Sequence, residues 1–393
     1  MLALLIGAEV TARLDDLARM DVPISAVLNS GYDLTVRDDL TLRGRPFGRH
    51  KMVRLNAGGF RGPPLAPEPP AGCVRVVVLG ASEAAGPKNR ARKDFPAQLH
   101  DSLQPHGCFE VHNAALGGQN ITQITLLWTS WVAQWAPDIV VVYPTPNFYL
   151  GNEAPTYPSG YRPPVKAPAW WQPRLFDRLS SPPSVLPRWV TIRRLRRSHA
   201  RTVSEHEPGW QYTAVPPDRL ALFEQHLDSL VRDIHARGAE PVLMTHATRF
   251  PEPPGAEDEL LMLEWSQGTR AAPRVQLDFE QAGRRSLLEL GRRRNVMVVD
   301  LAGRMTGHRE WFTDYSHFTD EGAGVVAQLL RDSVVALAGR LARDPLPPDS
   351  ARQASATEPS VPRRPGGRRL GARTRRGHPV RRRPRTGARP ACS

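Results

Sequence analysis

At 393 residues the chain is long enough for one large domain or two ordinary ones. Its net charge of +14 would favour a nucleic-acid or membrane partner if it were spread over the whole chain, but residues 345–393 hold 13 arginines and only two acidic residues. The other residues carry 40 basic and 37 acidic side chains, so the body that they form is nearly neutral and we expect no specific nucleic-acid partner.

The first eight residues, Met1–Ala8, are apolar, but they lack a basic leader and are followed by Glu9. This stretch is far short of the roughly 20 residues that a membrane span needs, so we expect a helix that continues through Leu14 and Leu17. If the stretch is instead the remnant of a signal or anchor, the protein works in the cell envelope. Otherwise it is cytoplasmic, and membrane contact through this helix is weak.

Residues 1–70 are interpreted as an extension that ends in a proline-rich linker, 63–70. A dense β-branched run then predicts a buried parallel strand over 74–79, followed by a helix over 95–103 and a second strand over 109–113. The next helix is amphipathic, and the apolar residues on its stripe are assigned to the core: Ile121, Ile124, Trp128, Trp131 and Trp135.

A third strand is predicted over 139–143. In residues 151–216 the pattern dissolves into proline, tryptophan and arginine, which indicates an insertion over the carboxyl edge of the sheet and a candidate substrate lid. The remaining elements alternate: a helix over 219–237 closed by Gly238, a strand over 241–245, a helix over 275–292, a strand over 296–300 and a helix over 320–341 capped by Thr319.

Strands that alternate with helices predict an α/β fold, in which a parallel five-stranded sheet has helices on both faces. We place this domain at residues 71–344, with the insertion at about 151–216. The tail, 345–393, has almost no large apolar residues, so it cannot offset its ordering entropy and is expected to be disordered. Its arginines would bind nucleic acid or anionic lipid only nonspecifically.

The three cysteines, the last of which is Cys392, fit neither a disulfide framework nor a zinc site. Cys73 and Cys108 each precede a predicted strand, and those two strands are candidates for neighbours. A bridge would need Cβ atoms within about 4.5 Å of each other, and we do not expect one between Cys73 and Cys108.

Ser82 stands between small residues directly after the first predicted strand. Open α/β sheets bind ligands at the carboxyl ends of their strands, so this serine is placed where a nucleophile would be useful. The alternative is that Ser82 only caps the following helix.

A serine nucleophile needs a base, and the base usually needs a third group that orients it. Asp314 and His317 offer both, because one turn of chain can bring the carboxylate of an Asp against the imidazole of a His three residues later. The other ring nitrogen then remains free to face Ser82. The alternative for this segment is a surface turn with a helix-capping histidine.

Two further strand ends carry candidate hydrogen-bond donors. Gly118 follows the second strand and presents an unobstructed backbone N–H, and Asn147 follows the third strand with a side-chain amide. With the N–H of Ser82 they form a candidate oxyanion hole, in which one donor is worth roughly 3–4 kcal/mol of barrier. Singly, they are a turn glycine and a loop asparagine; jointly with Asp314 and His317 they predict an acyl-transfer site.

These residues lie in four blocks that resemble those of the SGNH/GDSL hydrolase superfamily, which is named for Ser, Gly, Asn and His in this order. The segments Gly80–Gly86, Asn113–Gly118 and Thr145–Phe148 are similar to its first three blocks. The segment Asp314–His317 matches the Asp-x-x-His block residue for residue.

The resemblance spans about residues 56–341, because Asn56–Gly62 is similar to an Asn-x-x-Gly-Phe-Arg-Gly lead-in of bacterial members. Two positions depart from the family pattern. Ala81 replaces the aspartate of the first block, and Phe148 replaces that of the third. Neither position is a triad member or an oxyanion donor in the family, so the catalytic set is retained.

The resemblance implies a flavodoxin-like three-layer α/β/α fold and the hydrolysis of carboxylic esters through an acyl-Ser82 intermediate. In this scheme His317 takes the Ser82 proton, Asp314 orients the imidazole, and Ser82, Gly118 and Asn147 bind the oxyanion. No metal or organic cofactor is implied, and the expected substrate is a small-molecule or glycan ester.

Two other functions remain open at this stage. An O-acyltransferase or acetyl-esterase acting on cell-envelope polysaccharide would use the same site, with Trp170, Trp171 and Trp210 of the insertion lining a sugar groove. A catalytically inactive binding module would instead use the arginine-rich tail to engage nucleic acid or membrane. His246, after the fourth strand, and Arg61 are weaker candidates for substrate contacts.

Overall fold

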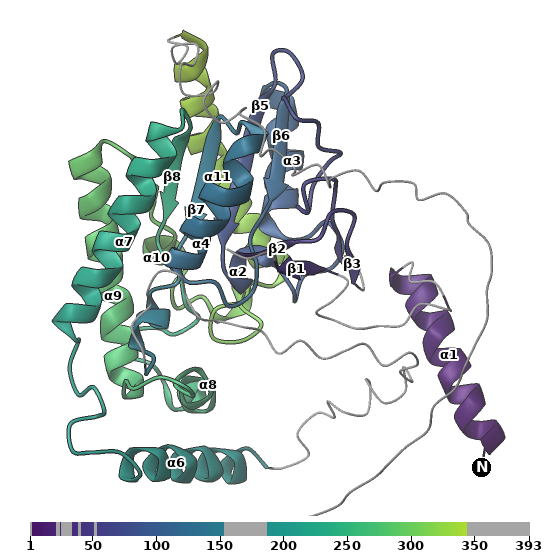
Figure 1. Cartoon of the computed structure of the whole chain (residues 1–393). Coiled ribbons are helices and arrows are strands. Elements are labelled where there is room, and N and C mark those ends of the chain that lie inside the picture. Colours follow the sequence, from purple (N-terminus) through teal and green to yellow (C-terminus); the bar gives the residue numbers. More distant parts are fainter. Residues whose placement is uncertain are drawn as a thin grey trace, which may run out of the picture. The chain divides into compact units, whose positions relative to one another are not determined.

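A parallel five-stranded sheet organises the structure (Figure 1). The computed structural model describes residues 2–20, 24, 34–37, 41–50, 53–152 and 187–343. The strands lie in the order β6, β5, β7, β8, β9, and all four pairings between them are parallel. Their bounds are β5 (Val74–Gly80), β6 (Phe109–Asn113), β7 (Ile139–Tyr143), β8 (Glu240–Met244) and β9 (Met297–Val299). The predicted parallel sheet is confirmed.

The strand order is that of flavodoxin-like folds, because the chain crosses back over β5 after β6 and places β7 on its other side. This reversal creates a switch point between β5 and β7. Open α/β sheets bind ligands at the carboxyl ends of the strands at such a point. Ser82 follows β5 and Asn147 follows β7, so the switch point carries two of the predicted site residues.

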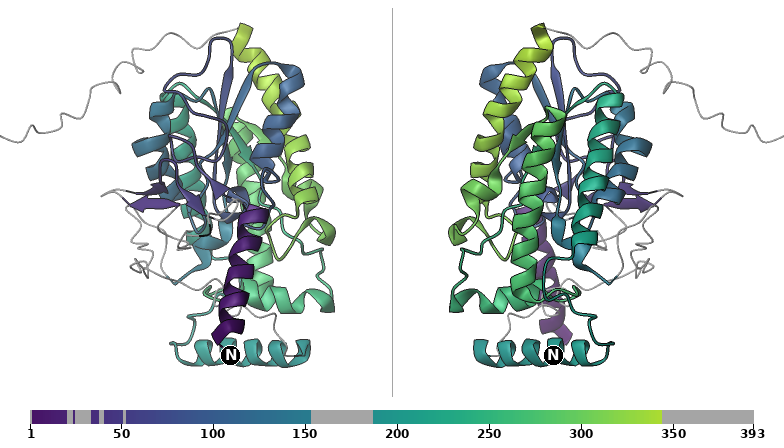
Figure 2. Two further views of the ribbon diagram at one scale, coloured as in Figure 1. Left: turned by 90° about the vertical axis from the view of Figure 1, so that its right-hand side faces the viewer. Right: turned by 90° about the vertical axis from the view of Figure 1, so that its left-hand side faces the viewer.

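Hydrophobic cores lie on both faces of the sheet, because successive residues of a strand point to opposite sides. In β5, Val77 and Leu79 pack in one core, and Val76 and Val78 pack in the other. The first core includes α4 (Ile121–Leu127), α7 (Pro217–Ala236) and α9 (Pro273–Arg294), and the second includes α3 (Phe95–Leu103) and α11 (Asp320–Arg343). Figure 2 shows these helices on the two sides of the strands. The predicted three-layer α/β/α arrangement is confirmed.

The helix predicted after β6 is confirmed in its packing but is not regular. α4 is continued by a π-helical turn, Trp128–Val132, and a 3-10 turn, Ala133–Trp135. A π-helical turn holds more residues than an α-helical one. Trp128 is buried, while Trp131 and Trp135 pack against the same core with their rings edge to face at 6.1 Å. The tryptophan stripe is therefore core packing, as predicted.

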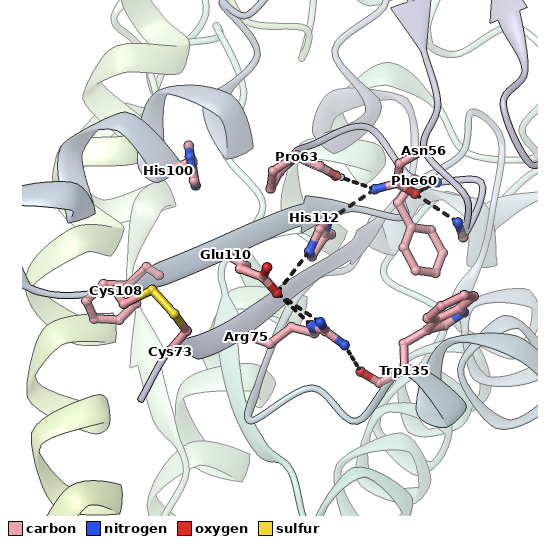
Figure 3. A network of polar contacts seen from close by, with 12 residues as sticks. Asn56, Phe60, Pro63, Cys73, Arg75, His100, Cys108, Glu110, His112 and Trp135 are labelled. Carbon is pink, nitrogen blue, oxygen red and sulfur yellow. Dashed lines mark hydrogen bonds and ion pairs between the residues drawn. A yellow bond between two sulfur atoms is a disulfide. The ribbon is translucent and has the colours of Figure 1, made fainter. Parts of the chain in front are cut away.

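The segment before β5 is attached to the edge of the sheet at β6 (Figure 3). The Asn56 side chain fixes a turn there by accepting hydrogen bonds from the backbone N–H groups of Gly58 and Phe60. Arg61 then pairs with Asn113 of β6 through two backbone hydrogen bonds, of 2.9 and 2.7 Å. The lead-in motif thus holds the chain against the strand that precedes the glycine block.

A buried ion pair joins β5 to β6 near this segment (Figure 3). Arg75 is fully buried, and its guanidinium donates to Glu110 at 2.9 and 3.0 Å. The same guanidinium donates to the carbonyl oxygens of Pro67 and Trp135, at 3.1 and 2.6 Å. Arg75 and Glu110 are partners in the register of the two strands, so sheet pairing itself brings the charges together.

Cys73 and Cys108 form a disulfide, which corrects the expectation that no bridge joins them (Figure 3). The two cysteines directly precede Val74 and Phe109, which are register partners in adjacent strands. Pairing of β5 with β6 therefore brings the cysteine Cα atoms to 4.4 Å, within the usual range for a disulfide.

After β7, three α-helices of the described residues lie where the sequence predicted none. α6 (Arg188–Ser204) lies inside the predicted insertion, α8 (Glu259–Trp265) follows β8, and α10 (Leu301–Met305) follows β9. Arg196 of α6 pairs with Glu259 of α8, so these two helices are in contact. Residues 153–186 of the candidate lid, with Trp170 and Trp171, and the arginine-rich tail lie outside the described residues.

The N-terminal part contains the predicted helix, α1 (Leu2–Met20). It also contains two short antiparallel pairs, β1 (Thr35–Arg37) with β2 (Leu42–Gly44), and β3 (Arg49–His50) with β4 (Val53–Arg54). Within the described parts of the chain, no helix is long and apolar enough to cross a membrane.

Candidate active site

Ser82 begins the short helix α2 (Ser82–Ala85), directly beyond the carboxyl end of β5. Ala81 has an extended backbone, and Gly86 ends the helix in the left-handed region, at φ 65°. The chain thus turns sharply out of the sheet and leaves Ser82 half-buried at the edge. The described residues provide no acceptor for the backbone N–H of Ser82, so this group is available to a ligand.

Asp314 and His317 lie in the loop before α11, where a backbone bridge between Phe312 and Phe318 closes a tight turn. Nδ1 of His317 lies 2.9 and 3.0 Å from the two carboxylate oxygens of Asp314. The carboxylate also accepts the backbone N–H groups of Ser316 and His317, at 3.1 and 2.9 Å. These bonds hold the ring with Nδ1–H on the carboxylate, which leaves Nε2 as the nitrogen with a free lone pair.

The contacts between Asp314 and His317 shift the pKa values of both residues. Burial alone would raise the pKa of the Asp314 carboxyl, but its hydrogen bonds with His317 lower that pKa below its ordinary value. Burial alone would lower the pKa of His317, but the hydrogen bond to Asp314 and the negative charge of Glu83 raise it. The imidazole is therefore a stronger base than an isolated histidine.

The glycine block after β6 lies against the nucleophile. A Cβ added to Gly117 would stand 3.8 Å from the Cβ of Ser82. Gly118 has a φ of +78°, in the left-handed region that favours glycine, and a Cβ there would meet open space. The described residues give the N–H of Gly118 no acceptor, so it can act as a second donor.

Asn147 lies in a 3-10 turn, Pro146–Leu150, that directly follows β7. Its side chain is half-buried and forms no hydrogen bond with the described residues, and its Oδ1 atom is buried without a partner. The side-chain amide is therefore not committed to another group of the described protein.

The structure brings the Ser82 turn and the His317 loop together, although no hydrogen bond between the Ser82 hydroxyl and the His317 ring is present in the described part. The link is Glu83, which accepts a 2.8 Å hydrogen bond from the hydroxyl of Ser316. The Ser82 hydroxyl itself lies 3.4 Å from the Glu83 carboxylate. In free enzymes, catalytic hydrogen bonds are often longer than in the complex with substrate.

Glu83 lies in the candidate site but was not among the residues predicted from the sequence. Its carboxylate also accepts from the Thr145 hydroxyl at 3.4 Å, two residues before Asn147, and lies 3.6 Å from Nε2 of His246. Glu83 is 6% exposed, so these contacts replace water almost completely. A glutamate directly after a candidate nucleophile was the available signal, but its partners are distant in sequence.

His246 lies between two carboxylates, since its Nδ1 atom is 2.9 Å from Glu280 on the side away from Glu83. Burial would lower the pKa of His246, but the charges of Glu280 and Glu83 raise it to about 10. Burial would likewise raise the pKa of Glu83, but the interactions with His246 and the charge of His317 lower it to about 2. Near neutral pH, His246 is thus a cation and Glu83 an anion.

Two residues considered for substrate contact have other partners. Arg61 donates to the carbonyl oxygen of Ala85 at 2.7 Å and pairs with Asp94 at 2.8 Å, so it supports the turn that follows Ser82. His246 is only 4% exposed and is held by the two carboxylates. A direct role for either side chain in holding substrate is not supported.

No family model matches the sequence, and no curated protein matches it. Several solved structures do. The lipase/acylhydrolase from Enterococcus faecalis is 14% identical with a TM-score of 0.40, over 67% of this chain and 96% of that chain. An acetylxylan esterase from Geobacillus stearothermophilus, solved as a catalytic mutant, is 13% identical with a TM-score of 0.38, over 68% and 94%. A GDSL-like lipase from Bacteroides thetaiotaomicron is 13% identical with a TM-score of 0.37, over 68% and 89%. At this level of similarity, function has to be inferred from the residues of this chain.

Proposed function

We propose that this protein is a serine esterase or acylhydrolase of the SGNH/GDSL type. The observation that carries the proposal is the Asp314–His317 pair, whose loop is joined through Glu83 to the turn that presents Ser82. Three donors without an acceptor among the described residues, on Ser82, Gly118 and Asn147, follow three adjacent strands and would supply the oxyanion hole.

In the proposed mechanism, Nε2 of His317 takes the proton of the Ser82 hydroxyl as the oxygen attacks the ester carbonyl carbon. Asp314 keeps the imidazole in the required tautomer and stabilises the imidazolium. The negative charge that develops on the carbonyl oxygen is held by the oxyanion donors. The alcohol leaves with the proton from His317, and water then cleaves the acyl-Ser82 ester with the same base.

His317 is a better base for this step than Glu83, although the Glu83 carboxylate lies 3.4 Å from the Ser82 hydroxyl. The pKa of the Glu83 carboxyl is about 2, so its carboxylate is a weak acceptor for a hydroxyl proton. The pKa of His317 is raised above its ordinary value of 6.5, so its neutral imidazole accepts the hydroxyl proton more readily than an unperturbed histidine does. Hydrolysis, with water as the acyl acceptor, is the predicted reaction, and transfer to a sugar hydroxyl is the predicted alternative. Small-molecule and glycan esters are both predicted substrates.

A fluorophosphonate probe tests the nucleophile directly. We expect it to label the full-length protein at Ser82, as located by peptide mass, because only an activated serine hydroxyl attacks such phosphorus centres. The variant Ser82→Ala should lose the label and lose hydrolysis of p-nitrophenyl acetate while keeping the same melting temperature. A control variant, Ser102→Ala, removes a hydroxyl of α3 that, among the described residues, donates to Leu99 of its own helix, and it should behave as wild type. Equal hydrolysis by wild type and Ser82→Ala would refute the proposed function.

A further inference from the structure

We propose that Glu83 is a positioning residue of this site, whose buried carboxylate fixes the segments that carry Ser82, Asn147 and His317 relative to one another. The inference deepens the proposed function and rests on it for its catalytic meaning. It concerns a residue that is neither a triad member nor an oxyanion donor in the mechanism above.

Glu83 forms hydrogen bonds with residues of three segments of the site. One carboxylate oxygen, Oε1, accepts from Ser316 at 2.8 Å, and the other, Oε2, accepts from Ser82 and Thr145 at 3.4 Å each. Ser316 directly precedes His317, and Thr145 precedes the 3-10 turn of Asn147. One side chain therefore joins the segments after β5 and β7 and the loop before α11.

The charge of Glu83 argues for more than a packing role. A buried carboxylate is costly to desolvate, and well-packed apolar residues often serve stability equally well. Here the charge is retained with His246 as its cationic partner at 3.6 Å, and the oxygens also accept hydroxyl hydrogen bonds. Such an arrangement holds three polar groups in fixed directions, which a hydrophobic side chain cannot do.

The carboxylate also acts on the base through its charge. The charged groups that act on His317 are the carboxylates of Asp314 and Glu83, which favour the imidazolium, and the ammonium of Lys88, which opposes it. Lys88 lies 3.9 Å from Asp314 and is half exposed, so its charge is well screened. The imidazolium forms when the Ser82 proton is transferred, so Glu83 stabilises the state that the reaction creates.

The variant Glu83→Gln removes the charge of this side chain and nearly keeps its shape. It therefore tests the effect of the charge on His317 apart from the packing of the side chain. We expect the midpoint of His317, followed by NMR of its ring protons in the full-length protein, to move to lower pH. The acid limb of kcat/KM for p-nitrophenyl acetate should move in the same direction, since the base must be neutral to act. We expect kcat itself to fall about 10- to 100-fold, as small displacements of reacting groups do.

Glu280→Gln is the matched control. It removes the other buried carboxylate on His246, on the side that lines a cavity of about 330 Å³ together with Thr248 and Leu277. Glu280 makes no hydrogen bond to the Ser82 turn or the His317 loop within the described residues, so the His317 midpoint should stay at its wild-type value. A midpoint that is the same in Glu83→Gln, Glu280→Gln and wild type would overturn the proposal.

If Glu83→Gln does not fold, Ser316→Ala tests the same link without removing the charge. This variant loses the 2.8 Å hydrogen bond to Glu83, so kcat should fall while KM changes little. Wild-type kcat in Ser316→Ala would then overturn the proposal. Because the NMR titration needs no turnover, it can succeed or fail independently of fluorophosphonate labelling at Ser82, which tests the proposed function.

Discussion

His246 and the two carboxylates beside it hold three charges in a region that water hardly reaches. Removing such charges from water costs several kcal/mol per ion, which the attraction between partners offsets only in good geometry. Because the pKa of His246 is raised to about 10 and that of Glu83 is lowered to about 2, both remain charged across the neutral range. The pH dependence of folding therefore reports on this group.

We expect the stabilisation from His246 and Glu83 to be complete only between about pH 4.5 and 6.5. The folded-state pKa of His246 lies above its ordinary value of 6.5, so its contribution is lost as the pH rises toward about 10. The folded-state pKa of Glu83 lies below its ordinary value of 4.5, so its contribution is lost as the pH falls toward about 2. Urea unfolding across this range measures both losses.

The variant His246→Gln provides the control for this pH dependence. Without the imidazole, the decrease in the free energy of unfolding above pH 6.5 should become smaller, whatever the variant's overall stability. An alkaline decrease of the same size in wild type and variant would show that other groups are responsible.

The pair of strands β5 and β6 contains a fully buried charged residue, Arg75. Arg75 shares its strand with Val77 and Leu79, on the face that packs against α4, α7 and α9. Its guanidinium satisfies Glu110 and two carbonyl oxygens at once. Removing the arginine takes the donor away from all three acceptors, of which the Glu110 carboxylate is 14% exposed.

We expect Arg75→Met to lower the free energy of unfolding by about 3–5 kcal/mol, the usual cost of leaving one member of a buried ion pair without its partner. Denaturant unfolding followed by circular dichroism measures the loss. In the double variant Arg75→Met/Glu110→Met the uncompensated carboxylate is gone, so part of the stability should return. A single variant as stable as wild type would contradict this account of the strand pair.

The strands and most helices of the sheet domain were predictable because each has a clear local pattern. β7 is a continuous apolar run, β5 is a β-branched run interrupted by Arg75, and α7 carries an apolar stripe. α6 was missed because arginine fills so many of its positions that none of its residues is buried. α8 was missed because it has only seven residues, which is too short to display a period.

The candidate site was predictable only in part, because some of its contacts join residues that are distant in the sequence. Ser82, Asp314 and His317 stand in short motifs that local spacing reveals. Glu83 gains its meaning from Ser316, which lies 233 residues away in the sequence, and from His246. The disulfide was missed because the sequence makes β5 and β6 only candidates for neighbours, whereas the order of strands in the sheet makes them partners.

The disulfide between Cys73 and Cys108 restrains the whole domain, because it closes 35 residues of chain that include α3. In the chain-entropy model, a loop of this length contributes about 4 kcal/mol at 25 °C. We expect Cys73→Ser/Cys108→Ser to lose up to this amount in denaturant unfolding, and a reducing agent to lower the melting temperature of wild type only. Labelling of Ser82 should be unchanged, since the cysteines precede the strands and Ser82 follows them. Equal unfolding with and without reductant would contradict the bridge.

The distance in sequence between Glu83 and Ser316 has a consequence for synthesis. A ribosome adds about 5–20 residues per second, so roughly 10 to 50 s separate the two ends of this contact. During that interval the nascent chain carries its nucleophile without a base, and the loop of His317 can dock only once α11 has followed it out of the exit tunnel. On the proposed function, a chain that ends before α11 is therefore inactive toward esters, and activity begins once α11 has been made.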